Sequence, residues 1–400
     1  MLLFQHWVYL INFQVPNREG KYIVMINSSK NNINSIEIKL ATLSTSTKAQ
    51  SWLIKYKSNQ PECLELKQHF NQSIGDKFAA LNDTNKIKFD KYVQIHQGLI
   101  PLQQEIESNG FNLNTQILSN VRNKFLSQAK NSSHRNKLDK NFTALERAID
   151  DNQKLNTQLT LVGTRTHRIT TRNFNVQGLP KEVKQLILAT HFDKVFMIDF
   201  KAFEPSVVAY ITGDKQLKEH LNSSQGLYDT LLNNLSLTET HRKLVKCAFI
   251  GSFLFGGNYM NDKFKLNQYI SEDEWNKAMS KFSNVIKLKE QISNKKIVKM
   301  PYGITHDMKH CHGSSIMALY VQTASSYIFK NILWEVYQHQ CDQEDFRIML
   351  PIHDAIMIEC NTDEVAERVR QLMETSTNYL FRDNFAHTTI EQLGGNHNDK

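Results

Sequence analysis

The chain contains 400 residues, carries a formal net charge of +8 and has a sequence pI near 9.0. This length accommodates two or more domains or one multi-lobed enzyme, and the moderate positive charge permits a polyanionic partner without requiring one. No apolar run approaches the roughly 18 residues of a membrane-spanning helix, so we expect no membrane association. The 5 cysteines are odd in number and form no Cys-x-x-Cys pair, which predicts reduced thiols in an intracellular, cytoplasmic protein.

Residues 1–90 contain no recognisable functional motif. Residues 7–13 and 22–26 are strand-like, and the composition becomes helical or mixed from Ala49. The first aspartate of the chain is Asp76, so this segment lacks the strand-borne Asp-x-Glu pair with which a proofreading exonuclease holds two metal ions. We therefore expect a separate N-terminal region of unknown role and no proofreading.

A helix and a basic helical segment come next. Residues 99–106 predict a helix that the pair Asn109-Gly110 ends. Residues 117–155 have helical spacing and include a basic cluster at 130–140. Such a cluster is usually a solvated helix face, but it also suits contacts with phosphates.

The stretch 164–180 is basic and non-helical. Its arginines Arg165, Arg168 and Arg172 alternate with threonine and asparagine residues. This mixture suits a loop that lies along a nucleic-acid groove, and the alternative is an exposed basic loop.

The central motif is a strand followed directly by an acid and a helix. Residues 195–198 are apolar and β-branched, Asp199 ends this run, and Glu204-Pro205 opens an apolar helix. A carboxylate at such a strand end is suited to hold a divalent cation. Taken alone, a solvated loop aspartate is an equally good interpretation.

A second motif places two cations on a helix at 238–257. Arg242, Lys246 and Ile250 follow one another at intervals of four residues and therefore share one helix face. This face suits a triphosphate with room for a base beyond it. The alternative, a solvated basic stripe, is weakened because the flanking residues are apolar.

The remaining motifs lie towards the C-terminus. His306, His310, Cys311 and His312 cluster but lack the spacing of a fourth zinc ligand, so a polar loop is favoured over a metal site. Residues 316–337 predict a long helix with Gln322 in its middle. Residues 346–360 predict two strands with His353-Asp354 at the turn between them.

Together these motifs suit two-metal phosphoryl transfer. Asp199 and Asp354 would hold two Mg²⁺ ions, for which Mn²⁺ is a possible substitute. Arg242 and Lys246 would neutralise the triphosphate, and Lys246 would also protonate the leaving pyrophosphate. The predicted catalytic residues are therefore Asp199, Asp354 and Lys246.

From about residue 92 to the C-terminus the chain resembles family A DNA polymerases, the class of bacterial polymerase I and phage replicative enzymes. Asp199 to Asp214 resembles motif A, Arg242-x-x-x-Lys246 resembles motif B, and His353-Asp354 resembles motif C. The resemblance implies that Glu204 blocks a ribose 2′-OH, and that the nucleotide-binding residues are Arg242, Lys246, Ile250 and Glu204. It also implies primer–template contacts by Arg168, Asn173, Gln177, Gln322 and His353.

Several positions depart from the family pattern. Motif B has Ile250 and Leu254 where the family has an aromatic residue and a tyrosine, which predicts weaker stacking on the incoming base. Motif C has Ala355 in place of glutamate, and Ser314 and Ala318 replace an arginine and an asparagine upstream of Gln322. The thumb is short, which predicts low processivity or a processivity partner.

The sequence thus predicts an α+β right-hand polymerase with a shortened thumb and a small N-terminal region. The expected boundaries are an N-terminal region at 1–90, a first helix and reduced thumb at 91–164, palm at 165–225 and 311–400, and fingers at 226–310. The expected reaction is templated addition of dNTPs to a DNA primer 3′-OH. Two alternatives stay open, namely a catalytically decayed primer–template binding protein and a related single-subunit enzyme that uses rNTPs.

Overall fold

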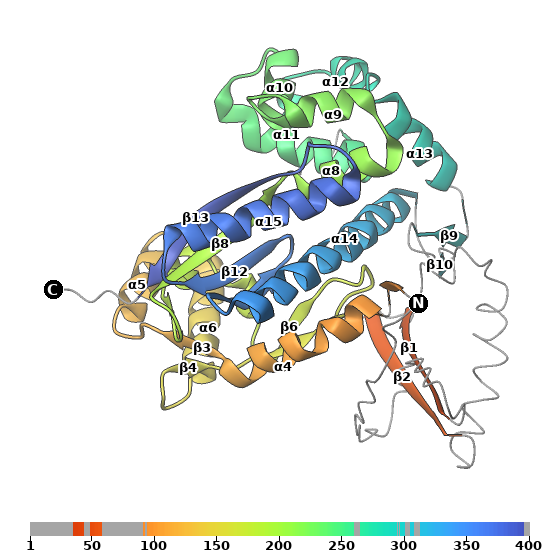
Figure 1. The fold of residues 1–400 in the computed structure, drawn as a ribbon. Coiled ribbons are helices and arrows are strands. Elements are labelled where there is room, and N and C mark those ends of the chain that lie inside the picture. The colour runs from red at the N-terminus through yellow and green to blue at the C-terminus, as the bar shows by residue number, and fades with distance from the viewer. Residues whose placement is uncertain are drawn as a thin grey trace.

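The computed structural model describes residues 35–43, 49–57, 91–92, 94–259, 265–293, 295, 297–300, 305–307 and 313–395. Within them the fold is α+β, with a central sheet, a helical lobe at one end and a mixed lobe beside the sheet (Figure 1). One continuous set of buried apolar side chains runs from Tyr92 to Ala386 and links these parts. None of the described helices is long and apolar enough to span a bilayer.

The central sheet has four antiparallel strands in the order β11-β12-β8-β13. Their bounds are β8 Lys194–Lys201, β11 Phe346–Ile352, β12 Ala355–Cys360 and β13 His387–Gly395. Side chains alternate between the two faces of a strand, so Ile198 and Phe200 of β8 point to one face and Asp199 to the other. Phe200 stacks on Phe203 at 4.6 Å, and Phe203 meets Phe329 at 6.4 Å, so Asp199 lies on the face opposite these rings.

Three helices accompany the ring-bearing side of the sheet. Their bounds are α8 Phe203–Thr212, α14 Gly313–Gln343 and α15 Asp363–Phe381. The long helix α14 packs against α8, α15 and β11, and α15 packs against β12 and β13 (Figure 1). The long helix expected at 316–337 lies within α14, and the two strands expected at 346–360 are β11 and β12. Both predictions are confirmed.

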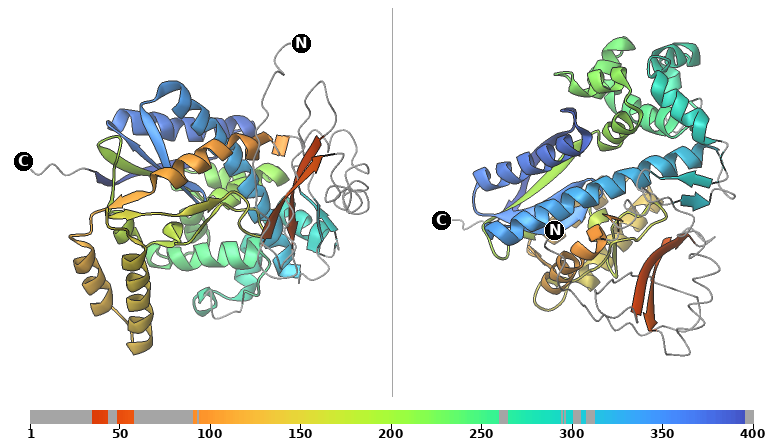
Figure 2. Two further views of the ribbon diagram at one scale, coloured as in Figure 1. Left: turned by 90° about the horizontal axis from the view of Figure 1, so that it is seen from below. Right: turned by 45° about the vertical axis from the view of Figure 1, so that its right-hand side comes forward.

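A helical lobe extends from one end of the sheet, seen again in the right-hand view of Figure 2. Its bounds are α9 Lys215–Asn222, α10 Leu227–Asn234, α11 Arg242–Ala248, a π-helical segment Phe249–Leu254, α12 Glu272–Met279 and α13 Ser283–Ser293. Ser271 and Glu274 form a reciprocal capping box at the start of α12, which satisfies backbone donors that a helix start leaves free. Short 3₁₀ turns lie at Glu239–His241 and Leu266–Gln268.

A mixed lobe precedes the sheet in the chain. Its bounds are α4 Ile100–Asn109, β3 Phe111–Leu113, α5 Leu118–Ser127, α6 Ser132–Ala148, β4 Lys154–Leu155, β5 Gln158–Thr160, β6 Thr170–Arg172, α7 Lys181–Lys184 and β7 Ile187–Leu188. Gly110 ends α4 as predicted, with φ +57°, where a Cβ would approach Asn156 Oδ1 to 2.7 Å. Arg122 joins α5 to α6 through Asp139 and Glu146, each at 2.6 Å.

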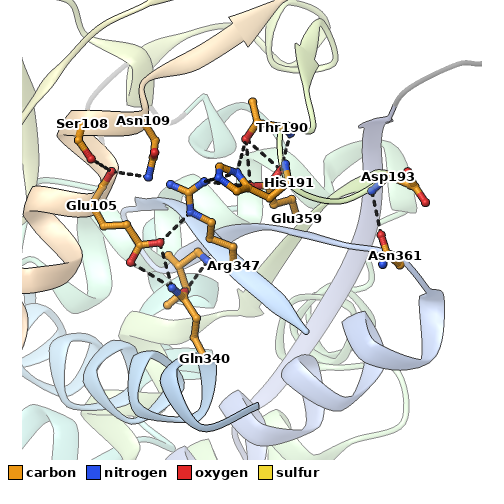
Figure 3. Close-up of polar contacts among 11 residues, drawn as sticks. Glu105, Ser108, Asn109, Thr190, His191, Asp193, Gln340, Arg347, Glu359 and Asn361 are labelled. Atoms are coloured by element: carbon orange, nitrogen blue, oxygen red, sulfur yellow. Dashed lines mark hydrogen bonds and ion pairs between the residues drawn. The ribbon is translucent and has the colours of Figure 1, made fainter. Parts of the chain in front are cut away.

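A buried polar network ties the mixed lobe to the sheet (Figure 3). Arg347 Nε lies 2.7 Å from Glu105 Oε1, and Arg347 Nη1 lies 3.4 Å from Glu359 Oε1. The Glu359 side chain is fully buried, and its Oε2 accepts hydrogen bonds from the backbone N–H groups of Thr190 and His191. Since a buried carboxylate is tolerated only when it is paired and hydrogen-bonded, this network fixes α4 and the 189–193 loop against β11 and β12.

The N-terminal part is described only as two paired strands, β1 Ser35–Leu43 and β2 Ala49–Lys57. Of the helical or mixed character expected from Ala49, the helical alternative is wrong for residues 49–57, and residues 58–90 lie outside the described residues. Residues 49–57 alternate strand formers such as Trp52, Ile54 and Tyr56 with their neighbours, a pattern with a period of two. The strands expected at 7–13 and 22–26 lie outside the described residues, and two further short strands are β9 Ile297–Lys299 and β10 Thr305–Asp307.

Candidate active site

The two predicted metal ligands lie on neighbouring strands of the central sheet. Asp199 of β8 pairs with Ala355 of β12, so Asp354 stands one residue beyond this pair. The Phe200 N–H donates to the Asp354 carbonyl at 3.4 Å, which ties the hairpin tip to the strand that carries Asp199. Carboxylates separated by more than 150 positions in the sequence are therefore brought together by strand pairing.

A tight backbone turn precedes Asp354, and another follows Asp199. His353 adopts a left-handed conformation with φ +55°, and Ala202, between Asp199 and α8, does so with φ +52°. A non-glycine residue in this region costs about 1–3 kcal/mol, and such strain gathers at functional sites. The two strained turns lie next to the carboxylates at one end of the central strands β8 and β12. Asp199 does not end its strand as expected, because β8 continues to Lys201.

The electrostatic environment raises the pKa of both aspartates. The pKa of Asp199 is raised to about 7, mainly by burial and secondly by repulsion from Asp354, while the charge of Lys246 opposes the rise. Burial raises the pKa of Asp354, which Arg168, His353 and Lys246 oppose. Asp199 is nevertheless accessible to solvent, so the raised pKa reflects a carboxylate that is crowded by protein but open to a ligand.

Glu204 lies in the first turn of α8 and forms an ion pair that sequence reasoning did not find. Arg168 Nη2 lies 2.5 Å from Glu204 Oε1, with side chains 31% and 17% exposed. Burial raises the pKa of Glu204, Arg168 opposes this, and Asp354 adds to it. Glu204, predicted to exclude a ribose 2′-OH, and Arg168, predicted to contact primer–template, are thus paired beside Asp354.

The predicted nucleotide-binding cations lie on α11 of the helical lobe. Lys246 is exposed, and its charge acts on Asp199, Asp354 and Glu204. Arg242 is the first residue of α11, and its Nε lies 2.7 Å from Asp229 Oδ1. Lys246 therefore acts on the carboxylates from the helical lobe, whereas Arg242 is paired with Asp229.

The predicted base-stacking position follows α11 in the π-helical segment Phe249–Leu254. Ile250 is half-buried and packs against the core, while Leu254 is buried. Single π-helical turns inside helices are frequent at functional sites.

Two further residues at the site were missed by sequence reasoning. Tyr228 of α10 is 5% exposed, and its ring lies beneath Arg242 Cζ at 5.8 Å and Lys246 Nζ at 5.6 Å. Burial lowers the pKa of Lys184, whose charge acts on Asp199. Neither lies in a recognisable motif, and only the tertiary fold brings them to the site.

The predicted primer–template residues have unequal surroundings. Gln177 is buried, and its Nε2 donates to the Pro351 carbonyl at 2.7 Å, just before the hairpin turn. Asn173 is exposed with φ +66°. Gln322 lies one turn before Ser326 on α14, whose hydroxyl donates to the His167 carbonyl at 2.7 Å. Gln322 therefore shares the helix face that meets the Arg168 turn.

Within the described ranges, no group of three or more His, Cys, Asp or Glu residues is arranged to hold a metal ion. The polar loop expected around His310, Cys311 and His312 lies outside the described residues, and His306 belongs to β10.

Comparisons with known proteins agree with this geometry. The family model described as DNA polymerase family A matches residues 56–382. Among solved structures, the POL domain of Pol1 from M. smegmatis, in complex with DNA primer-template and dNTP, aligns with a TM-score of 0.64 at 12% identity, over 74% of this chain and 69% of that chain. At this identity the alignment shows a shared polymerase-domain fold. No curated protein sequence matches the chain.

Proposed function

Because this chain belongs to DNA polymerase family A, we propose that it is a template-directed DNA polymerase that adds dNTPs to a primer 3′-OH. The observation that carries the proposal is the meeting of Asp199 and Asp354 at one end of the neighbouring strands β8 and β12, near the charge of Lys246 of the helical lobe. Two carboxylates and a facing cation are the parts that phosphoryl transfer requires.

The two aspartates fit Mg²⁺, and Mn²⁺ as its substitute. The pKa of Asp199 is raised to about 7, in part by repulsion from Asp354. A bound divalent cation would offset this repulsion between the two carboxylates. Mg²⁺ is usually held by one or two protein carboxylates together with substrate phosphates and water, which suits a site with two acids. Bound metal would supply activation of the primer hydroxyl and stabilisation of the leaving pyrophosphate.

The remaining site residues have roles that follow from their charge and position. Arg242 and Lys246 neutralise the triphosphate, and the Lys246 ammonium donates its proton to the leaving group. Glu204 occupies the position that excludes a ribose 2′-OH, and its pairing with Arg168 at 2.5 Å holds it there. Ile250 offers an apolar surface to the base without the stacking of an aromatic ring.

The primer–template is bound, in this proposal, by Arg168, Asn173, Gln177, Gln322 and His353.

The thumb corresponds to residues 91–164, the palm to 165–225 and 311–400, and the fingers to 226–310. The pair α5–α6 projects from the rest of the molecule in the left-hand view of Figure 2, which suits a short thumb that grips duplex weakly and depends on a processivity partner. Residues 1–90 would add no proofreading.

A second candidate function is a primer–template binding protein without catalysis. Ile250 and Ala355, which depart from the family motifs, favour it. A third candidate is a polymerase that uses rNTPs, which the acid at Glu204 disfavours.

One assay distinguishes these functions. The full chain is given a labelled DNA primer on DNA and RNA templates, with dNTPs or rNTPs and Mg²⁺ or Mn²⁺. The proposal predicts templated extension with dNTPs on DNA. Tight primer–template binding without extension under either metal supports the decayed protein, and efficient rNTP incorporation by the unmutated chain supports the third candidate.

A further inference from the structure

Helices α10 and α11 are neighbours in the helical lobe (Figure 1). The two cations of α11 contact two adjacent residues of α10. Asp229 Oδ1 lies 2.7 Å from Arg242 Nε. The Tyr228 ring centroid lies 5.8 Å from Arg242 Cζ and 5.6 Å from Lys246 Nζ. Each cation therefore contacts α10, and Arg242 contacts both of its residues.

The contact with Asp229 uses only one edge of the Arg242 side chain. A guanidinium carries five N–H donors in a fixed plane, and Asp229 takes the Nε donor. Within the described part of the chain, neither the Nη groups of Arg242 nor the Lys246 ammonium has another hydrogen bond or ion pair. The donors that remain are those that a phosphate can accept from.

Tyr228 is a rigid support for these side chains. It is 5% exposed and meets Phe249 edge-on at 6.4 Å. A cation over an aromatic face is attracted by the negative charge of the ring face. The aromatic surface beneath the two cations is therefore provided by α10.

We infer that Asp229 and Tyr228 are positioning residues, which hold Arg242 and Lys246 in the arrangement that receives the triphosphate of an incoming nucleotide. The inference rests on the proposed function, because it takes a nucleoside triphosphate as the ligand. Arg242 is 47% exposed at the first position of a helix, where an unsupported side chain would sample many rotamers. Fixing Nε on Asp229 removes that freedom before the ligand arrives.

The negative charge of Asp229 also repels a triphosphate, and the two effects have opposite signs. Positioning dominates because the Asp229 charge is neutralised by direct contact with Arg242, whereas the orientation of Arg242 depends on that contact. Asp229→Ala removes both the charge and the contact. Asp229→Asn removes the charge but keeps an oxygen that accepts from Nε.

The test measures dNTP binding by the full chain with primer–template and Mg²⁺, using equilibrium dialysis, alongside primer extension. Asp229→Ala raises Kd and KM about three- to five-fold, the loss expected of one exposed ion pair, with kcat within about two-fold of wild type. Asp229→Asn lies between wild type and Asp229→Ala. Tyr228→Leu raises Kd and KM as well, whereas Tyr228→Phe, which keeps the ring, does so less.

Two controls separate positioning from a general structural effect. When Arg242 is already alanine, Asp229→Ala no longer raises Kd, because the double-mutant cycle then has no pair to break and only the repulsion by Asp229 is removed. Asp345→Ala removes a matched ion pair with Arg368, in which the two side chains are 37% and 49% exposed. Asp345 precedes β11, at the end of the strand away from the His353–Asp354 turn. This variant leaves dNTP binding unchanged.

An unchanged or lower Kd in Asp229→Ala overturns the inference, as does an equal effect with and without Arg242. A wild-type chain that binds no dNTP overturns it too. The wild-type chain could bind dNTP without extending a primer, with Asp229→Ala weakening that binding. This result upholds the inference and rejects the proposed polymerase. If Tyr228→Leu fails to fold, the variants of Asp229, whose side chain is 34% exposed, still decide the question.

Discussion

Arg168 Nη2 and Glu204 Oε1 lie 2.5 Å apart and join the loop after β5 to the first turn of α8, across 36 positions of the chain. Burial raises the pKa of Glu204 and the Arg168 charge opposes it. The acid proposed to exclude a ribose hydroxyl is therefore held by a residue proposed to contact primer–template.

Sugar discrimination should depend on both members of this pair. Glu204→Ala should lower the dNTP-over-rNTP ratio of kcat/KM by about 10–200-fold, the range for loss of one discriminating contact. Arg168→Ala should lower the same ratio by a smaller factor, because unpaired Glu204 loses its fixed position and its pKa rises further. Arg172→Ala, at an exposed arginine nearby, serves as the control. An unchanged ratio in Arg168→Ala would mean that Arg168 acts on DNA alone.

Removing the Asp199 charge should stabilise the metal-free protein. The pKa of Asp199 rises from 3.8 to about 7 on folding, so the folded chain binds this proton more tightly than the unfolded chain. The free energy of unfolding therefore falls as pH rises from about 4 to about 7 through this group. Asp199→Asn should raise the Tm in EDTA at pH 8, and raise it less at pH 5. A variant that is less stable than wild type at pH 8 would contradict the electrostatic account.

The Glu359 network should matter for stability and not for chemistry. Glu359→Ala removes a fully buried carboxylate from Arg347 and leaves backbone donors of Thr190 and His191 without their acceptor. Loss of one partner of a buried pair costs about 3–5 kcal/mol, measurable by urea unfolding at constant pH. Asp345→Ala, in an exposed pair with Arg368, should cost about 0–1 kcal/mol. Equal costs for the two variants would refute a structural role for the network.

The parts of the site that depend on local pattern could be predicted from the sequence. The apolar run before Asp199, the two strands around His353-Asp354 and the glycine after Asn109 each follow from side-chain periodicity or backbone conformation. The family resemblance then placed Asp199 and Asp354 in one site, and antiparallel pairing of β8 with β12 brings them together.

Contacts between distant segments could not be predicted in the same way. Asp229 and Tyr228 precede Arg242 in another helix, and only the packing of α10 on α11 reveals their contacts. Gln177 has the polarity of a nucleic-acid contact, yet its amide bonds to the Pro351 carbonyl. The strand at Ala49–Lys57 was missed because its two-residue alternation is flanked by serine and threonine stretches typical of loops.

The central claim is that Asp199 and Asp354 together support templated DNA synthesis. Its most direct test is single-turnover extension of a labelled primer on a DNA template, with Mg²⁺ and dNTPs, by wild type and by Asp354→Asn. The account predicts extension by wild type and a rate at least about a hundred-fold lower in the variant, because several kcal/mol of transition-state stabilisation by metal are lost. Extension by Asp354→Asn at the wild-type rate would contradict it.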